Sequence, residues 1–287
     1  MVARRIRCQW QGTTITVGMD QAGAGPAVVL LPALSSISTR AEMRPLFDQL
    51  AADFRVTTVD WPGFGDLPRP RVDWSPDALA AFLNWFLSDI TPESRIVVAA
   101  GHAATYALHQ AASLPETIER LVLIAPTWRG PLPTMFGAYR PWFGYIPKVV
   151  DLPLIGQLLY RLNVSRWVVS KMTREHVYSE PRWLSGERLA GKLAVTRAPG
   201  ARHASVRFVT GRLDPVASRM EFHSLVLKAA KPTLIVYGEE TPSRSRTEIE
   251  TLIGLPNVQM QLLRKGKLSI HEEFPQAVAS VIRPFLT

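Results

Sequence analysis

The fold of this chain is decided by one stretch, Arg95-Ile-Val-Val-Ala-Ala-Gly-His-Ala-Ala-Thr-Tyr-Ala-Leu108. It begins as an apolar run, passes through a corner of small residues between Gly101 and Thr105, and continues as a helical pattern to about Ser113. A buried strand that turns sharply into a helix is the frame of a nucleophile elbow, a motif written G-x-S-x-G. In this reading the serine position of the motif is occupied by Ala103.

Short apolar runs alternate with helical patterns on both sides of this corner. We expect strands at residues 13–20, 27–31, 55–60, 95–100, 121–125, 232–238 and 258–263. We expect helices at residues 41–54, 77–90, 247–253 and 272–286, besides the one that follows the corner. Such an alternation predicts an α/β protein with a doubly wound, mostly parallel sheet.

The alternation stops between residues 126 and 231, where prolines and aromatic residues precede helical stretches rich in Leu, Arg and Trp. The simplest organisation is a core made of residues 1–125 and 232–287, with residues 126–231 inserted as a helical cap. The cap also carries the charge: residues 127–228 hold sixteen Lys and Arg against six Asp and Glu, whereas the net charge of the whole chain is +9. These cations are either solvated helix faces or a surface that attracts an anionic membrane or an acidic ligand.

The bulk properties fit a soluble cytoplasmic protein with peripheral membrane contact as an alternative. The chain has one cysteine, Cys8, so an intramolecular disulfide is excluded and a reducing compartment is expected. No apolar run of signal or membrane-spanning length is present. The six histidines lack metal-ligand spacing, no cofactor motif is found, and no nucleic-acid-reading module accompanies the basic charge. We therefore expect neither metal nor cofactor, and the sequence disfavours nucleic acid as a partner.

Several motifs occur in a fixed order along the chain. They are Val28-Val-Leu-Leu-Pro-Ala-Leu-Ser35, Asp60-Trp-Pro-Gly-Phe-Gly65, the Gly101-His-Ala corner, the strand ending at Gly238, and His271-Glu-Glu-Phe-Pro275. Together they resemble the α/β-hydrolase superfamily, in the capped architecture of haloalkane dehalogenases and epoxide hydrolases. The resemblance implies the α/β-hydrolase fold with a lid at the insertion, whereas the activity depends on the site residues.

The positions that the resemblance assigns to the catalytic triad carry inert side chains. Ala103 stands at the nucleophile, Thr241 at the acid in Gly238-Glu-Glu-Thr241, and Leu268 at the histidine base, three residues before His271. Acyl transfer on this scaffold needs a hydroxyl, a base and an orienting carboxylate. The resemblance is therefore to a member that lacks the triad, and whether the chain is an enzyme stays open.

Other residues are candidates for relocated chemistry. His102 adjoins the corner and is expected to be packed; His271 begins the last helical segment and is expected to cap or pair there. Asp214 follows a stretch, Phe208-Val-Thr-Gly-Arg-Leu-Asp-Pro215, that itself resembles a strand with an acid loop. Pro32 and Ala33 replace the usual His-Gly of the oxyanion loop, and the N–H of Ala104 is a candidate donor to an anion.

Two function classes follow, and a third concerns the surface. The first is binding of an apolar small molecule or acyl chain, or of a partner, without serine hydrolysis, in a pocket under the cap. Its candidate lining residues are Pro32, Ala33, Leu34, Ala103, Ala104, Trp128, Phe136 and Trp142. The second is an active hydrolase or lyase that uses a relocated residue. The third is a peripheral membrane protein that docks through its basic cap.

Overall fold

The computed structural model describes residues 1–287 and is built on one eight-stranded sheet with the strand order β1-β2-β4-β3-β5-β6-β7-β8. The strands are β1 (Val2–Trp10), β2 (Thr13–Ala22), β3 (Ala27–Leu31), β4 (Arg55–Val59), β5 (Ile96–Ala100), β6 (Arg120–Ile124), β7 (Thr233–Gly238) and β8 (Val258–Leu263). Only the pairs β1–β2 and β2–β4 are antiparallel. The prediction of a doubly wound, mostly parallel sheet is confirmed.

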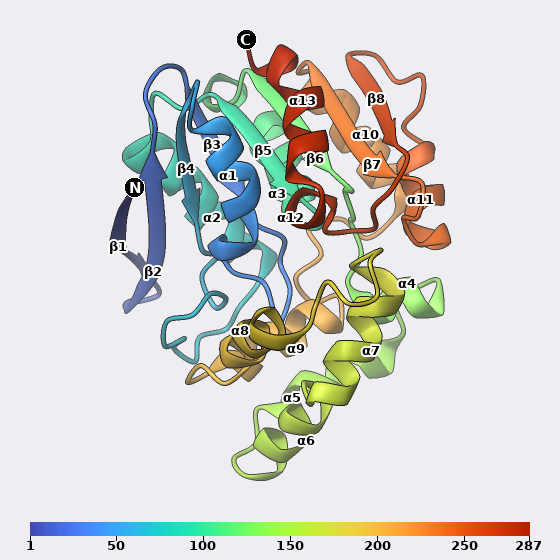
Figure 1. Cartoon of the computed structure of the whole chain (residues 1–287). Helices are drawn as coiled ribbons and strands as arrows, with labels where there is room; N and C mark the ends of the chain where they lie inside the picture. Colours follow the sequence, from blue (N-terminus) through green and yellow to red (C-terminus); the bar gives the residue numbers. More distant parts are fainter.

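Helices cover both faces of the sheet, because successive residues of each central strand point to opposite sides. Val98 and Ala100 of β5 belong to the hydrophobic cluster under α1 (Arg44–Leu50) and α13 (Pro275–Leu286), whereas Val97 and Ala99 belong to the cluster under α2 (Pro76–Trp85), α3 (Ala103–Ser113) and α10 (Arg219–Ala229). Figure 1 shows α1 and α13 in front of the sheet with α2, α3 and α10 behind it. The remaining core elements are η1 (Arg40–Met43), η2 (Phe86–Ile90), η3 (Pro115–Thr117), α11 (Ser243–Glu250) and α12 (Ile270–Glu273).

The strand β1 was not predicted, although the sequence carries a signal for it. The partly buried Ile6, Cys8 and Trp10 alternate with the exposed Arg5, Arg7 and Gln9, which is the pattern of a half-buried strand. It pairs with β2 through backbone hydrogen bonds at the edge of the sheet. One of its faces and the N–H and C=O groups of its outer edge stay open to water. Both this pairing and the packing of Ile6, Cys8 and Trp10 against the core support the strand.

Between β6 and β7 the chain forms only helices. In order they are α4 (Pro131–Phe136), η4 (Pro141–Tyr145), α5 (Ile146–Val150), α6 (Ile155–Asn163), α7 (Arg166–His176), α8 (Gly186–Thr196) and α9 (Ala201–Val209), followed by α10. Figure 1 shows α4 to α9 projecting beyond one end of the strands, with α5 and α6 farthest from the sheet. By contrast, α10 packs against α3 within the core layer, so the helical insertion does not form a single projecting unit. The predicted boundaries of the cap stay a prediction.

None of these helices combines the length and the apolarity that crossing a bilayer requires.

The packing of α1 on the sheet gives a testable expectation at Phe47, which is 1% exposed. Phe47→Ala should lower the free energy of unfolding by about 3–5 kcal/mol, because it removes a ring from a close-packed cluster and leaves a cavity. Urea unfolding measures the change. Ile253→Ala is the matched control, since Ile253 is 60% exposed, and a similar loss there would contradict the packing argument.

Candidate functional site at the strand-to-helix corner

The sharp turn between β5 and α3 has its apex at Gly101. The strand ends at Ala100, Gly101 adopts φ +53°, and the helix begins at Ala103 with His102 already in a right-handed conformation. A nucleophile elbow places its reactive residue on the strained turn between strand and helix. The geometry therefore puts the elbow residue at Gly101, two positions earlier than the sequence motif indicated. Ala103 instead lies buried in the first turn of α3.

The space above Gly101 is narrow. A Cβ atom added there would lie 3.1 Å from the Cβ of Ala33, closer than side-chain atoms normally approach. Ala33 stands where the sequence resemblance implies a glycine. The methyl group of Ala33 thus occupies room beside the position where a serine would carry its side chain, and the positive φ of Gly101 suits glycine best.

Two backbone amides at the corner have no partner. The N–H groups of Leu34 and His102 make no hydrogen bond within the chain, although Leu34 is 1% exposed and His102 is 1% exposed. An oxyanion hole in this kind of site uses the N–H after the elbow residue and an N–H from the loop after the β3-type strand. The expected donor Ala104 is excluded, because its N–H donates to the carbonyl of Gly101 at 3.2 Å.

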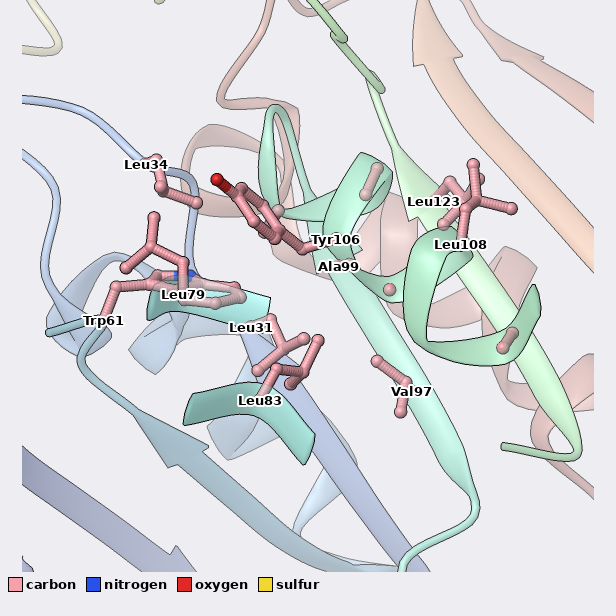
Figure 2. Packing of buried hydrophobic residues seen from close by; sticks show 14 of the residues in the cluster. Leu31, Leu34, Trp61, Leu79, Leu83, Val97, Ala99, Tyr106, Leu108 and Leu123 are labelled. Atoms are coloured by element: carbon pink, nitrogen blue, oxygen red, sulfur yellow. The ribbon is translucent and has the colours of Figure 1, made fainter. Parts of the chain in front are cut away.

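The neighbouring amide of Ala33 is already occupied. It donates to Oε1 of Glu42 at 2.6 Å, so a buried carboxylate is held against the oxyanion loop. On the other side of this loop, Trp61 donates from Nε1 to the carbonyl of Pro32 at 2.8 Å and lies against the ring of Tyr106, with 5.4 Å between ring centroids. Figure 2 shows Leu34 near Tyr106 and Trp61 in this part of the core.

The residues that the sequence resemblance assigned to the acid and the base, Thr241 and Leu268, carry no ionisable side chain. Thr241 follows β7, is 4% exposed, and its Oγ1 has no hydrogen-bond partner. Leu268 lies before α12, and its N–H donates to the carbonyl of His176 at 3.4 Å, which ties this loop to α7. A threonine hydroxyl and a leucine side chain supply neither a carboxylate nor an imidazole.

Two of the relocated candidates, His102 and Asp214, lie together. Nε2 of His102 is 3.2 Å from the carbonyl of Leu213 and 3.3 Å from Oδ1 of Asp214, while the N–H of Gly130 donates to both carboxyl oxygens of Asp214 at 2.9 and 3.0 Å. Burial lowers the pKa of His102 to about 4, and burial raises the pKa of Asp214 to about 7. The nearby hydroxyl of Tyr106 donates to Leu213 at 2.7 Å. Both partners therefore favour their neutral forms, and the pair anchors the loop before α10.

The interpretation of residues 208–215 as a strand with an acid loop is wrong. Phe208 and Val209 end helix α9, and no strand precedes Asp214. The Gly-Arg-Leu-Asp sequence resembles an acid loop only because short turn sequences recur after helices as well as after strands.

The third candidate, His271, belongs to a different buried cluster. Its side chain is fully buried, with Nε2 3.8 Å from Oε1 of Glu42. Lys192 of α8 places Nζ 3.1 Å from Oε2 of Glu272 and 3.9 Å from Oε2 of Glu42. Burial opposes ionisation of Glu42, but the nearby imidazole of His271 and the charge of Lys192 hold its pKa below the ordinary value. Likewise, burial opposes the charge of Lys192, but Glu272 and Glu42 raise its pKa.

Sequence reasoning missed Glu42 and Lys192. A signal existed for Glu42, because it adjoins the apolar stripe of the helix that contains Met43 and Leu46, both buried. No such signal existed for Lys192, which reaches the core from a helix 150 residues farther along the chain. Their contact joins the helices beyond the strand ends to the oxyanion loop.

The predicted lining residues do not all surround one place. Pro32, Leu34, Ala103 and Ala104 are buried around the corner, and Ala33 is partly buried. Trp128 is also buried, but its ring stacks on Phe222 and its Nε1 donates to Glu248 at 3.2 Å.

Phe136 and Trp142 are 44% and 49% exposed and pack against Phe143 at the surface of the cap. Their assignment to an enclosed pocket needs correction. Phe136, Trp142 and Phe143 pack on one another within the cap, whereas Phe208 is the insertion's aromatic residue that reaches the corner, with its ring centroid 5.5 Å from that of His102.

Two grooves lie elsewhere on the surface. One has a cavity volume of about 530 Å³ and is lined by residues that include Asp73, Trp74, Tyr139, Lys148 and Arg207. The other, of about 840 Å³, lies beside β1 and includes Arg5, Arg7 and Arg69. Neither is lined by a residue of the corner. The side chains of His, Cys, Asp and Glu form no group of three that could hold a metal ion.

Residues 28–281 match the alpha/beta hydrolase family. The chain belongs to this family. Pimeloyl-[acyl-carrier protein] methyl ester esterase of Aeromonas salmonicida is 26% identical over 281 residues, which covers 95% of this chain and 100% of the relative. The enzyme of the same name from Aeromonas hydrophila subsp. hydrophila is 27% identical over 286 residues, with 95% and 100% covered.

Solved structures share the fold across nearly the whole chain. Cfl2 of Burkholderia cenocepacia superposes with a TM-score of 0.75 at 22% identity, covering 99% of this chain and 96% of Cfl2. A thermophilic esterase of Thermogutta terrifontis gives 0.73 at 16% identity, with 99% and 98% covered. A putative ancestral haloalkane dehalogenase gives 0.71 at 19% identity, with 99% and 98% covered. At these identities the likeness concerns the fold.

The burial of Asp214 predicts a distinctive dependence of stability on pH. Its folded-state pKa of about 7 lies above the ordinary value of 3.8, so the folded state retains a proton that the unfolded state releases. The resulting stability is complete below about pH 4 and is lost as pH rises to about 7. Asp214→Asn should therefore become more stable than the wild type at about pH 8, by up to roughly 4 kcal/mol, and differ little at about pH 4.

Urea unfolding across this range measures the difference between variant and wild type. Asp151→Asn is the control of opposite sign: burial opposes ionisation of Asp151, but its contacts with Arg207 and His203 lower its pKa. Relative to the wild type, that variant should lose stability as pH rises toward the ordinary Asp pKa of 3.8, and the difference should stay nearly constant between about pH 5 and 8, where Asp214→Asn changes. A difference that does not change with pH for Asp214→Asn would refute the assigned protonation.

Proposed function

We propose that this α/β-hydrolase-family protein binds the carbonyl group of an acyl ester or thioester at the corner around Gly101 and does not cleave it by the Ser-His-Asp mechanism. One observation carries the proposal: the strained elbow residue is a glycine, whereas the amides of Leu34 and His102 beside it remain free. Two such donors suit a carbonyl oxygen. The site thus keeps the means to orient a carbonyl without a nucleophile to attack it.

The chemistry of the aligned residues supports binding without serine catalysis. A serine nucleophile needs a base to accept its proton and a carboxylate to orient that base. Gly101 has no side chain, Leu268 cannot accept a proton, and Thr241 carries no charge. The serine route requires all three functions at once, so restoring one of them alone would not produce efficient hydrolysis.

The ligand class is argued from the relatives and from the fold. The two Aeromonas relatives are named for action on a methyl ester of an acyl group carried on acyl-carrier protein. We extend to this chain only the acyl ester or thioester class, since an acyl chain is apolar and carries one carbonyl that two amides can hold. The partly buried methyl group of Ala33, the buried methyl group of Ala103 and the buried side chain of Leu34 make an apolar surrounding that suits such a chain.

A second candidate, hydrolysis by relocated residues, is favoured by the contact of His271 with Glu42. Neither ring nitrogen of His271 has a hydrogen-bond partner, and its Nε2 lies 3.8 Å from a carboxylate that also contacts the oxyanion loop. A histidine beside a carboxylate can act as a general base toward water. In this alternative the carbonyl would be held as above and water would attack it.

The two candidates differ in what the wild-type protein does to a model ester. We expect methyl octanoate to displace a fluorescent acyl ester, while p-nitrophenyl octanoate is not hydrolysed above the uncatalysed rate and a fluorophosphonate does not label the protein. Gly101→Val should abolish the displacement because its side chain would fill the space before the amides, whereas Gly191→Val, on the exposed face of α8, should not. Thermal melting checks that both variants fold.

Hydrolysis by the wild type that is lost in His271→Gln would establish the relocated mechanism instead. Labelling of a serine at the corner would contradict both candidates. Failure of methyl octanoate to compete, with a folded protein, would remove the proposed ligand class.

The position of the elbow residue is tested by rebuilding the triad with its serine at residue 101 or at residue 103. Gly101→Ser combined with Ala33→Gly, Thr241→Asp and Leu268→His should hydrolyse p-nitrophenyl octanoate roughly 100-fold faster than the wild type and react with a fluorophosphonate. Ala33→Gly relieves the 3.1 Å approach at the corner. The matched control replaces Gly101→Ser with Ala103→Ser and should stay inactive, because that position lies within the helix. Activity of the control alone would overturn the assignment of Gly101.

A further inference from the structure

Helix α6 presents its apolar stripe to solvent. Ile155, Leu158, Leu159 and Leu162 follow the spacing i, i+3, i+4, i+7 and are 60%, 60%, 42% and 59% exposed. A stripe with this spacing normally faces a hydrophobic core. Here the opposite side of the helix, with Gly156 and Tyr160, packs onto the rest of the cap. The amphipathic pattern of α6 is therefore reversed relative to that of a helix on a globular protein.

Further apolar side chains adjoin α6 in the chain and are also exposed. Leu152 and Leu154 in the α5–α6 connection are 48% and 86% exposed, and Leu154 is held at φ +58°. At the start of α7, Trp167 is 71% exposed. We call the α6 stripe together with these three residues the tip surface. Figure 1 shows α5 and α6 at the end of the molecule farthest from the sheet, so the tip surface is free to approach a large partner.

The exposed charged side chains around the tip surface are positive. Lys148, Arg161, Arg166 and Lys171 are exposed, and none of them forms a salt bridge. The single acidic residue between positions 131 and 174 is Asp151, which is neutralised by Arg207 and His203. The tip therefore combines exposed Leu, Ile and Trp with unpaired cations.

We propose that the tip surface docks on an anionic lipid membrane. An interfacial helix buries an apolar face at the boundary of headgroups and acyl chains while cations beside it contact anionic headgroups. Both parts are present at the tip, and the cations lack any acidic partner within the chain. Trp167, whose ring lies 5.4 Å from Nζ of Lys171, has the mixed character of side chains found at membrane interfaces. No step of this argument uses the corner at Gly101.

Sedimentation of the full chain with vesicles tests the proposal. The wild type should partition into vesicles that contain phosphatidylglycerol at least about tenfold more strongly than into pure phosphatidylcholine, and added salt should weaken the binding. Leu158→Glu with Leu162→Glu should reduce partitioning by about tenfold or more, because it places charge in the apolar face. Arg161→Gln with Lys171→Gln should reduce binding to the anionic vesicles only.

Matched controls lie elsewhere on the surface. Met220→Glu changes an apolar residue that is 79% exposed on α10, and Arg4→Gln with Arg5→Gln removes exposed cations from β1; neither should alter partitioning. Thermal melting verifies that every variant is folded. If the controls weaken binding as much as the tip variants, general charge rather than the tip surface is responsible and the proposal is wrong.

Two further outcomes would also overturn it. Absence of binding to anionic vesicles by the folded wild type excludes a lipid partner. Dimerisation in analytical ultracentrifugation that is lost in the Leu158→Glu, Leu162→Glu variant, without vesicle binding, would assign the tip surface to a second copy of the chain.

Discussion

The left-handed backbone of Gly101 is the constraint on which the centre of this molecule depends. It turns the chain from β5, which pairs with β3 and β6, directly into α3, which covers the sheet. The corner is fixed on both sides, because the N–H of Gly101 donates to Ile124 at 2.9 Å and its carbonyl accepts from Thr127 at 3.1 Å. The fold thus keeps the geometry of an elbow while the residue at its apex carries no side chain.

Buried polar contacts fasten the surrounding segments to this corner. His102, Tyr106 and Asp214 hold the loop before α10, whereas Glu42, His271 and Lys192 connect the oxyanion loop and α12 to the cap. Removing Lys192 or Glu42 would leave an uncompensated buried charge, and removing the polar groups of His102 or Tyr106 would leave the buried Leu213 carbonyl without a partner. These groups therefore have a structural reason to persist whether or not the corner carries out chemistry. Their position beside free amides is what makes carbonyl binding the function that we propose.

The apolar residues of the cap fall into two groups, one buried and one exposed. Trp128, Phe143 and Tyr160 are buried and join the cap helices to each other and to the core. The leucines of α6 and Trp167 are exposed beside cations that have no acidic neighbour. Because burial of apolar surface is the main favourable term in folding and association, an exposed stripe of this kind is a cost to the isolated chain. A membrane surface would offset this cost, and the corner remains independent of it.

The sequence by itself determined the mostly parallel sheet and the positions of its central strands along the chain, because apolar runs and periodic patterns record which faces are buried. The alternation of Ile6, Cys8 and Trp10 with polar residues also indicates β1, whereas the spatial order of the strands and the place of β1 beside β2 are tertiary features. The elbow register was also decided only by the tertiary structure: Gly101 and Ala103 are both small, and only the backbone dihedral angles distinguish them. The contacts of Glu42 with His271 and Lys192, and the outward direction of α6, join or orient segments far apart in the chain. Local patterns cannot specify such features, since they arise from packing between elements.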